Sequence, residues 1–152
     1  MKKSYLLLLV VLIMSSCSSN VLIEKSKVLE NNIWSVKDTL HLKVPNKFQD
    51  IDTYKLSVKI KHTDAFATNN LWFYLCKKSK DVYRKDTIMC MLSDKYGKWL
   101  GKKNGDYYER KIILFDTIKL NKGNKYSLIH GMRELNLKGI ETISLLIEKN
   151  IK

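Results

Sequence analysis

Apolar and polar residues alternate along much of the chain, and this alternation predicts strands. The clearest case is the segment of residues 54–62. Its apolar side chains are Tyr54, Leu56, Val58 and Ile60. In a strand, successive side chains point to opposite faces, so this spacing is typical of a sheet with one buried and one solvated face. Residues 70–76 are apolar on both sides, which predicts a central strand.

The same pattern predicts about eight short strands, with turn signals every ten or so residues. We expect them at Val21–Lys25, Asp38–Val44, Tyr54–His62, Asn70–Cys76, Asp86–Leu92, Glu109–Ile118, Lys125–Ile129 and Ile140–Glu148. Many short strands with regular turns favour an antiparallel β-sandwich. Residues 130–135, HGMREL, are expected to form one short helical turn. The predicted fold class is therefore all-β, with a single sandwich domain over residues 21–152.

The first seventeen residues have the pattern of a bacterial lipoprotein signal. Two lysines precede an apolar run from Tyr5 to Met14, and two serines precede Cys17. As a helix this run extends roughly 15 Å, about half the thickness of a bilayer, so it is too short to span one. We expect residues 1–16 to be a cleaved signal peptide, Cys17 to carry the lipid, and residues 17–20 to form a polar tether. An ordinary secretory signal, with Cys17 incidental, is the alternative.

The residues after Cys17 indicate where the lipid anchor is expected to sit. No acidic run follows Cys17, and no aspartate adjoins it. The first absence gives no signal for surface export, and the second gives none for retention in the inner membrane. The expected location is therefore the cell envelope, at the outer membrane and on its periplasmic face.

The chain is strongly basic. It contains 28 Lys+Arg against 15 Asp+Glu, a formal net charge of +13, and its only arginines are Arg84, Arg110 and Arg133. Proteins that bind nucleic acids usually gather their cations on one helix or face and favour arginine. Here the lysines are spread along the whole sequence. Nucleic acid is therefore not an expected partner, and the lysines are interpreted as a solvated surface near anionic lipid or polymer.

The segment from Leu92 to Asp106, LSDKYGKWLGKKNGD, is the most unusual stretch of the chain. Residues 93–97 predict a type I turn closed by a left-handed glycine, and residues 104–106 predict a tight primed turn. Between these turns an apolar cluster lies among four lysines. A loop that combines apolar and basic residues in this way is a candidate partner-binding loop. Its candidate binding residues are Asp94, Tyr96, Trp99, Leu100, Lys102 and Asp106.

Two other interpretations of this loop are open. Asp94 and Asp106 are either calcium ligands or turn caps, and the surrounding lysines favour caps. Trp99 is either a core plug or part of a sugar-stacking platform. The platform would consist of Tyr96, Trp99, Tyr107 and Tyr108.

The remaining reactive side chains predict no enzyme, metal site or cofactor. The three histidines, His41, His62 and His130, fall in separate predicted strands. No Gly-x-Ser-x-Gly elbow and no Cys-x-x-Cys pair is present. If the hairpin after residue 70 is centred on Tyr83, Cys76 lies opposite Cys90 and a disulfide is expected there; two buried free thiols are the alternative.

Several motifs together resemble a known family, the gliding motility lipoprotein GldH family of the Bacteroidota. The C-terminal half carries most of them, within LSDKYGKWLGKKNGDYYE and GNKYSLIHGMRELNLKGIETISLLIEK. The matching positions are Asp94, Gly97, Trp99, Leu100, Gly101, Gly105, Asp106, Met132, Arg133, Leu137, Gly139, Ile140, Ile147, Glu148 and Lys149. In the N-terminal half they are Asn31, Asn32, Trp34, His62, Thr63, Asn70 and Leu71. The chain departs from the family pattern at Lys61, Lys103 and Gly131, where arginine, glycine and alanine are usual.

The resemblance implies a function without catalysis. It implies a periplasm-facing lipoprotein of the gliding machinery and the linked type IX secretion system. Its implied partners are other gliding-machinery lipoproteins and membrane motor components, with the membrane contacted through the lipid. A carbohydrate- or peptidoglycan-binding sandwich is the competing interpretation of the residues.

Overall fold

The computed structural model describes residues 20–46, 48, 53–80 and 82–150. Within them the strands are β1 (Val21–Val28), β2 (Ile33–Ser35), β3 (Leu40–Lys43), β4 (Thr53–His62), β5 (Asn70–Lys78), β6 (Tyr83–Met91), β7 (Lys102–Asn104), β8 (Tyr107–Lys119), β9 (Lys125–His130), β10 (Asn136–Lys138) and β11 (Ile140–Lys149). The predicted signal peptide, the lipidation site Cys17 and residues 18–19 of the predicted tether lie outside the described residues.

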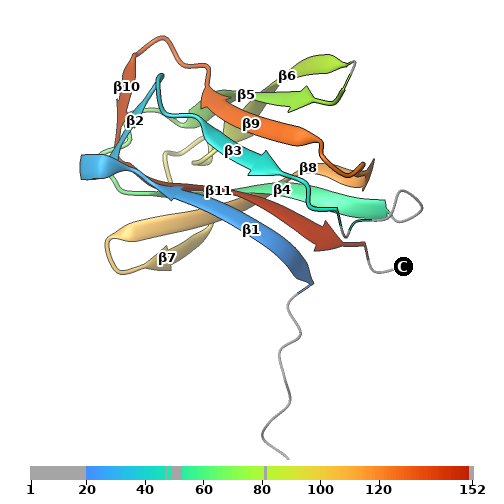
Figure 1. The fold of residues 1–152 in the computed structure, drawn as a ribbon. Helices are drawn as coiled ribbons and strands as arrows, with labels where there is room; N and C mark the ends of the chain where they lie inside the picture. Colours follow the sequence, from blue (N-terminus) through green and yellow to red (C-terminus); the bar gives the residue numbers. More distant parts are fainter. Residues whose placement is uncertain (1–19, 47, 49–52, 81, 151–152) are drawn as a thin grey trace, which may run out of the picture.

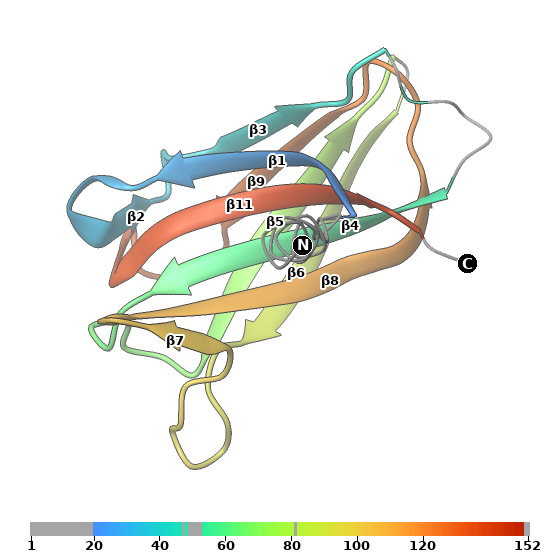
Figure 2. The same ribbon diagram turned by 90° about the horizontal axis from the view of Figure 1, so that it is seen from below.

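The strands form two packed layers (Figure 1). One layer is a five-stranded sheet in the order β1-β11-β4-β8-β7, and the other is a four-stranded sheet in the order β3-β9-β5-β6. Figure 2 shows the five strands of the first sheet side by side, and the two-stranded sheet β10-β2 lies at one end. All the pairings are antiparallel, which confirms the predicted all-β sandwich.

All eight predicted strands are present in the described residues, and the alternation placed the apolar face of β4 correctly. The four apolar side chains of β4 are 0–5% exposed and lie in the core between the sheets. β5 pairs with β6 on one side and β9 on the other, as expected for a central strand. Burial of each such aliphatic side chain contributes about 1.5–3 kcal/mol, so these two strands anchor the fold.

The helical turn predicted at residues 130–135 is wrong. β9 continues through His130, and the chain then follows bends until β10 begins at Asn136. The backbone groups of this segment bond to other parts of the fold: the N–H of Gly131 donates to the carbonyl of Trp72 at 2.7 Å, and the carbonyl of Leu135 accepts from the N–H of Val36 at 2.8 Å. Among the described residues, helical geometry is confined to a 3-10 turn at Glu30–Asn32.

The predicted pairing of Cys76 with Cys90 is also wrong. Cys90 lies opposite Leu71, and Cys76 lies opposite Lys85, because the β5–β6 hairpin turns before Tyr83 and not at it. Five residues of strand, roughly 16 Å, therefore separate the two positions along the ladder, well beyond disulfide reach. Both cysteines are buried free thiols, and burial raises the pKa of Cys90 to about 12.

This arrangement predicts the number of thiols in the mature protein. Lipidated chain that is denatured without reductant is expected to react with a thiol reagent at two sites, Cys76 and Cys90. Before denaturation Cys90 is expected to react far more slowly than a free cysteine, because its burial disfavours the thiolate that reacts. Recovery of a Cys76–Cys90 cross-link by peptide mapping of unreduced protein would contradict the observed register.

Candidate functional site

Ten of the residues that carry the family resemblance lie at one end of the sandwich, which we call the motif end. It consists of the β4–β5 loop (residues 63–69), the β6–β7 loop (residues 92–101) and residues 131–139, at the left in Figure 1. Backbone hydrogen bonds join these segments. The N–H of Thr63 donates to Gly139 at 2.8 Å, and the N–H groups of Leu92 and Ser93 donate to the carbonyl of Asn69 at 2.7 and 3.1 Å.

His62, the last residue of β4, lies at the centre of an aromatic cluster. Its ring is edge-to-face with Trp99 at 4.7 Å between centroids and stacks on Tyr108 at 5.6 Å. Phe66 lies 6.1 Å from His62 and 6.4 Å from Trp99. Because each aromatic pair contributes about 0.5–1.5 kcal/mol beyond its burial, this cluster fixes the two loops against β4.

The environment of His62 favours its neutral form. The Nδ1 atom lies 3.2 Å from the carbonyl of Thr63, so Nδ1 carries the proton and donates it. Nε2 is buried without a partner among the described residues. Burial lowers the pKa of His62, and the Thr63 carbonyl and Asp64 oppose this only in part.

A second buried histidine lies in the four-stranded sheet. His130 ends β9 and is edge-to-face with Trp34, at 5.4 Å between centroids. Trp34 is fully buried in β2, where it lies opposite Leu137 of β10, and its indole N–H donates to the carbonyl of Asp38 at 2.8 Å. Burial lowers the pKa of His130 as well. Neither histidine was predicted to hold the motif end together, because their partners are distant in the sequence.

Trp99 points inward, which answers the question left open by the sequence. It is half-buried, packs on the core and serves as a core plug. Tyr108 is engaged with His62, and Lys61 lies over Tyr107 at 4.3 Å from the ring centroid. The sugar-stacking platform is therefore not formed, since Tyr96, 81% exposed, is the only strongly exposed ring among its four predicted members.

Asp94 caps its own turn, as the sequence favoured. Its Oδ1 accepts from the N–H groups of Tyr96 and Lys98 at 2.8 and 2.9 Å, and Gly97 has a φ of 81°. Asp106 lies in the exposed two-residue turn between β7 and β8. No group of three metal-ligating side chains occurs within the described part of the chain.

The other predicted binding residues divide into two groups. Leu100 is half-buried, and its N–H donates to the carbonyl of Leu92 at 2.7 Å. Tyr96, Lys102 and Asp106 are exposed. The loop thus has an inner side that packs on the domain and an outer side that is accessible to another molecule.

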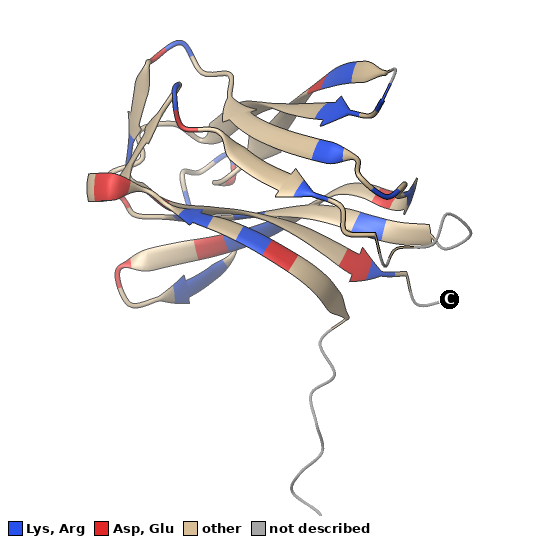
Figure 3. Ribbon diagram, viewed as in Figure 1, with Lys and Arg blue, Asp and Glu red and all other residues tan. Residues whose placement is uncertain are grey.

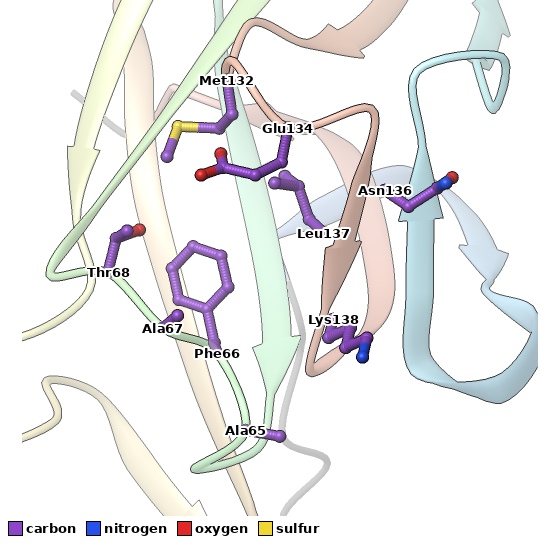
Figure 4. Close-up of a pocket in the computed structure, with 9 residues that line it drawn as sticks. All are labelled: Ala65, Phe66, Ala67, Thr68, Met132, Glu134, Asn136, Leu137 and Lys138. Carbon is purple, nitrogen blue, oxygen red and sulfur yellow. The ribbon is translucent and has the colours of Figure 1, made fainter.

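A pocket of about 280 Å³ opens beside the His62 cluster. Figure 4 shows the ring of Phe66 on its floor, with Met132 and Glu134 opposite and Leu137 alongside. Thr68, Ala67 and Lys138 complete most of the rim. No local pattern of residues indicates this pocket, because its two walls come from residues 65–68 and 132–138.

Exposed apolar side chains continue outward from the pocket. The Sδ atom of Met132 accepts from the N–H of Trp72 at 3.3 Å, which joins the pocket wall to β5. Trp72 is 40% exposed and lies opposite Met89, while Met91 follows on β6. A pocket with a flexible methionine in its wall, joined to a strand that carries an exposed tryptophan, is suited to an apolar partner.

Gly139 allows the close approach that forms one side of this site. A Cβ atom there would lie 2.3 Å from the backbone nitrogen of Phe66, and the φ of 85° is itself unfavourable for other residues. Gly123 has a φ of 82° but open space around it. Comparing alanine substitutions at Gly139 and Gly123 therefore distinguishes the energetic cost of the clash from that of the positive φ angle.

We predict that Gly139→Ala lowers the free energy of unfolding by more than about 3 kcal/mol, whereas Gly123→Ala lowers it by about 1 kcal/mol. Urea unfolding of both variants measures the difference. Equal losses would show that residues 65–66 move away from a Cβ atom at low cost.

The two histidines predict a pH dependence of stability. Their folded-state pKa values lie below the unfolded value, so the unfolded chain binds more protons. Stability is therefore complete above pH about 6.5 and falls as the pH decreases from there toward the folded-state pKa values, by up to about 1.4 kcal/mol per pH unit for each histidine. We predict that His62→Phe reduces this slope, measured from about pH 5 to about pH 7, by roughly half.

Urea unfolding at several pH values measures the slope. Tyr108→Phe is the control, because it alters the same cluster and keeps the imidazole. An unchanged slope in His62→Phe would show that folding does not lower the pKa of this histidine.

The described residues include no helix that is long and apolar enough to cross a membrane. Among solved structures, the chain is similar to Eiger TNF from S. frugiperda, at 8% identity and a TM-score of 0.40, over 87% of this chain and 96% of that one. It is also similar to dimeric latent PorU from Porphyromonas gingivalis, at 9% identity and a TM-score of 0.34, over 88% of this chain and 14% of that one. At these TM-scores neither structure informs on function.

None of the curated proteins compared with the chain matches it. A family model does match, under the description GldH lipoprotein, and the match covers residues 21–147. This span begins with β1 and ends within β11, so it includes the whole motif end. The chain therefore belongs to the GldH lipoprotein family, a family of gliding-motility lipoproteins.

Proposed function

We propose that this protein is a non-enzymatic accessory component of the gliding and type IX secretion machinery. In this proposal a lipid on Cys17 holds it at the outer membrane, facing the periplasm, and the motif end binds a partner lipoprotein or a membrane motor component. The observation that carries the proposal is the apolar pocket at the motif end, where ten of the residues that carry the family resemblance lie.

The motif end is built to bind without rearrangement. His62 and Trp99 fix the loops, and backbone hydrogen bonds join them to each other. A preformed pocket loses little conformational freedom on binding, and this favours affinity. Its apolar floor suits an aliphatic or aromatic anchor side chain, while Glu134 and Lys138 at the rim can select a partner by charge.

The same geometry supports a role without catalysis. His62 and His130 are buried among aromatic rings and do not line the pocket. The Cys90 thiol has its pKa raised to about 12 by burial, which disfavours a nucleophilic thiolate. The pocket itself is lined mainly by apolar side chains and holds a single carboxylate, Glu134.

The pocket can be blocked without disturbing the core. Ala67 is exposed and lines the rim, so Ala67→Arg should change stability by no more than about 0.5 kcal/mol while placing a long charged side chain over the opening. We predict that the lipidated variant, purified from its own membranes, recovers at least tenfold less of the gliding-machinery lipoproteins than the unmodified chain. Mass spectrometry of the co-purified proteins measures this loss.

Val82→Arg is the matched control, because Val82 is 61% exposed at the opposite end and the charge change is the same. The double variant Tyr96→Ala/Lys102→Glu tests the outer side of the segment Leu92–Asp106 separately. If Ala67→Arg and the variant with Tyr96→Ala and Lys102→Glu both recover these lipoproteins as the unmodified chain does, the motif end is not the binding site. If the unmodified chain recovers none, the proposed role itself is refuted.

A further inference from the structure

Three lysines form a row across the outer face of the four-stranded sheet. Lys43 of β3 lies opposite Lys125 of β9, and Lys125 lies opposite Lys78 of β5. All three are exposed. Residues directly opposite in antiparallel strands have Cβ atoms about 4.5–5.5 Å apart, so like charges placed there destabilise the sheet.

In the five-stranded sheet, by contrast, the lysines of β4 form ion pairs. On β4, the Nζ atoms of Lys55, Lys59 and Lys61 lie 3.1, 2.6 and 3.2 Å from carboxylates of Asp116, Glu24 and Glu141. No carboxylate of the described residues forms an ion pair with Lys43, Lys78 or Lys125. The row is therefore a concentration of uncompensated charge, and it requires a reason outside the sheet.

The row borders two adjoining depressions. One, of about 460 Å³, is lined by His41, Cys76, Tyr83 and Ser127 together with the three lysines. The other, of about 540 Å³, shares Lys43 and Lys125 and adds Lys80 and Lys122. No acidic residue of the described chain lines either depression; Asp81, next to Lys80, lies outside the described residues. Ammonium groups at the rim of a shallow depression suit a phosphate group.

The row lies at the end of the sandwich where the chain enters from Cys17. β1 begins at Val21, opposite Glu148 near the end of β11, and β3 and β5 end and β9 begins on this same side. Figure 3 shows the blue ends of β3 and β5 and the blue start of β9 there. Three residues lie between Cys17 and Val21, so their Cα atoms are at most roughly 14 Å apart.

We propose that Lys43, Lys78 and Lys125 bind the phosphate groups of anionic lipids in the bilayer that holds the anchor. The anchor end then lies on the membrane, and the motif end faces away from it toward its partner. This docking mode rests on the lipid anchor of the proposed function. Each lysine near an anionic surface adds to the attraction, and salt weakens it.

The test uses the purified lipidated protein in nanodiscs, made either of phosphatidylcholine alone or of equal parts phosphatidylcholine and phosphatidylglycerol. A water-soluble acetylating reagent and mass spectrometry report how fast each lysine reacts. We expect Lys43, Lys78 and Lys125 to react at least threefold more slowly in the anionic discs, with the difference lost in high salt. Lys98 and Lys102 at the motif end should react alike in both. Equal rates for the row would overturn the proposal.

A triple variant, Lys43→Gln, Lys78→Gln and Lys125→Gln, provides the second measurement. It should abolish the slower reaction of the neighbouring Lys80 and Lys122 in anionic discs, whereas Lys95→Gln, Lys98→Gln and Lys102→Gln should preserve it. Protection of the row by inorganic phosphate or peptidoglycan fragments in neutral discs, equal to that by anionic discs, would assign the site to a soluble anion and overturn the membrane assignment.

The two proposals fail in different ways. A chain that does not co-elute with discs of either composition refutes the lipid anchor, and this docking mode with it. Lysine protection without recovery of partner lipoproteins refutes the accessory role and supports the docking surface.

Discussion

The edge-to-face contact between His62 and Trp99 is the interaction on which the motif end depends. Trp99 belongs to a loop that contains two glycines with positive φ, Gly97 and Gly101. Within this loop one β-bridge, between Ser93 and Trp99, pairs the backbone. Such a loop loses much conformational freedom when it is ordered. The ring of Trp99 recovers part of that cost by packing on His62, which β4 holds rigidly in the sheet.

Histidine at this position has a cost and a compensation. Nε2 of His62 is buried without a described partner, which costs about 1–3 kcal/mol. A phenylalanine would avoid that cost but would lose the hydrogen bond from Nδ1 to the Thr63 carbonyl. That bond fixes the first residue of the β4–β5 loop, whose next residues form one wall of the pocket. His62 thus orders the start of the β4–β5 loop, although its unpaired Nε2 atom lowers the stability of the fold.

Features that depend on neighbouring residues could be predicted from the sequence, whereas features that depend on residues distant in the chain could not. The faces of β4 were predictable, because alternation is a property of neighbouring residues. β2, β7 and β10 were not, since three residues are too few to show a period. The turn at 130–135 failed because Leu135 bonds to Val36, far away in the chain, and the cysteine pairing failed because the residues of the β5–β6 turn did not fix its register. The pocket joins two distant segments, so no local pattern could reveal it.

Strand register determines which of the lysines lie close together, and the composition alone does not show this. In the sequence they are dispersed, and dispersion favoured a generally solvated surface. Strand pairing brings Lys43, Lys78 and Lys125 into one row, although dozens of residues separate them, while it gives each lysine of β4 an acidic neighbour. A net positive charge alone would attract the protein to an anionic bilayer in many orientations. A row confined to the anchor end selects one orientation, and in that orientation the motif end remains accessible to a partner.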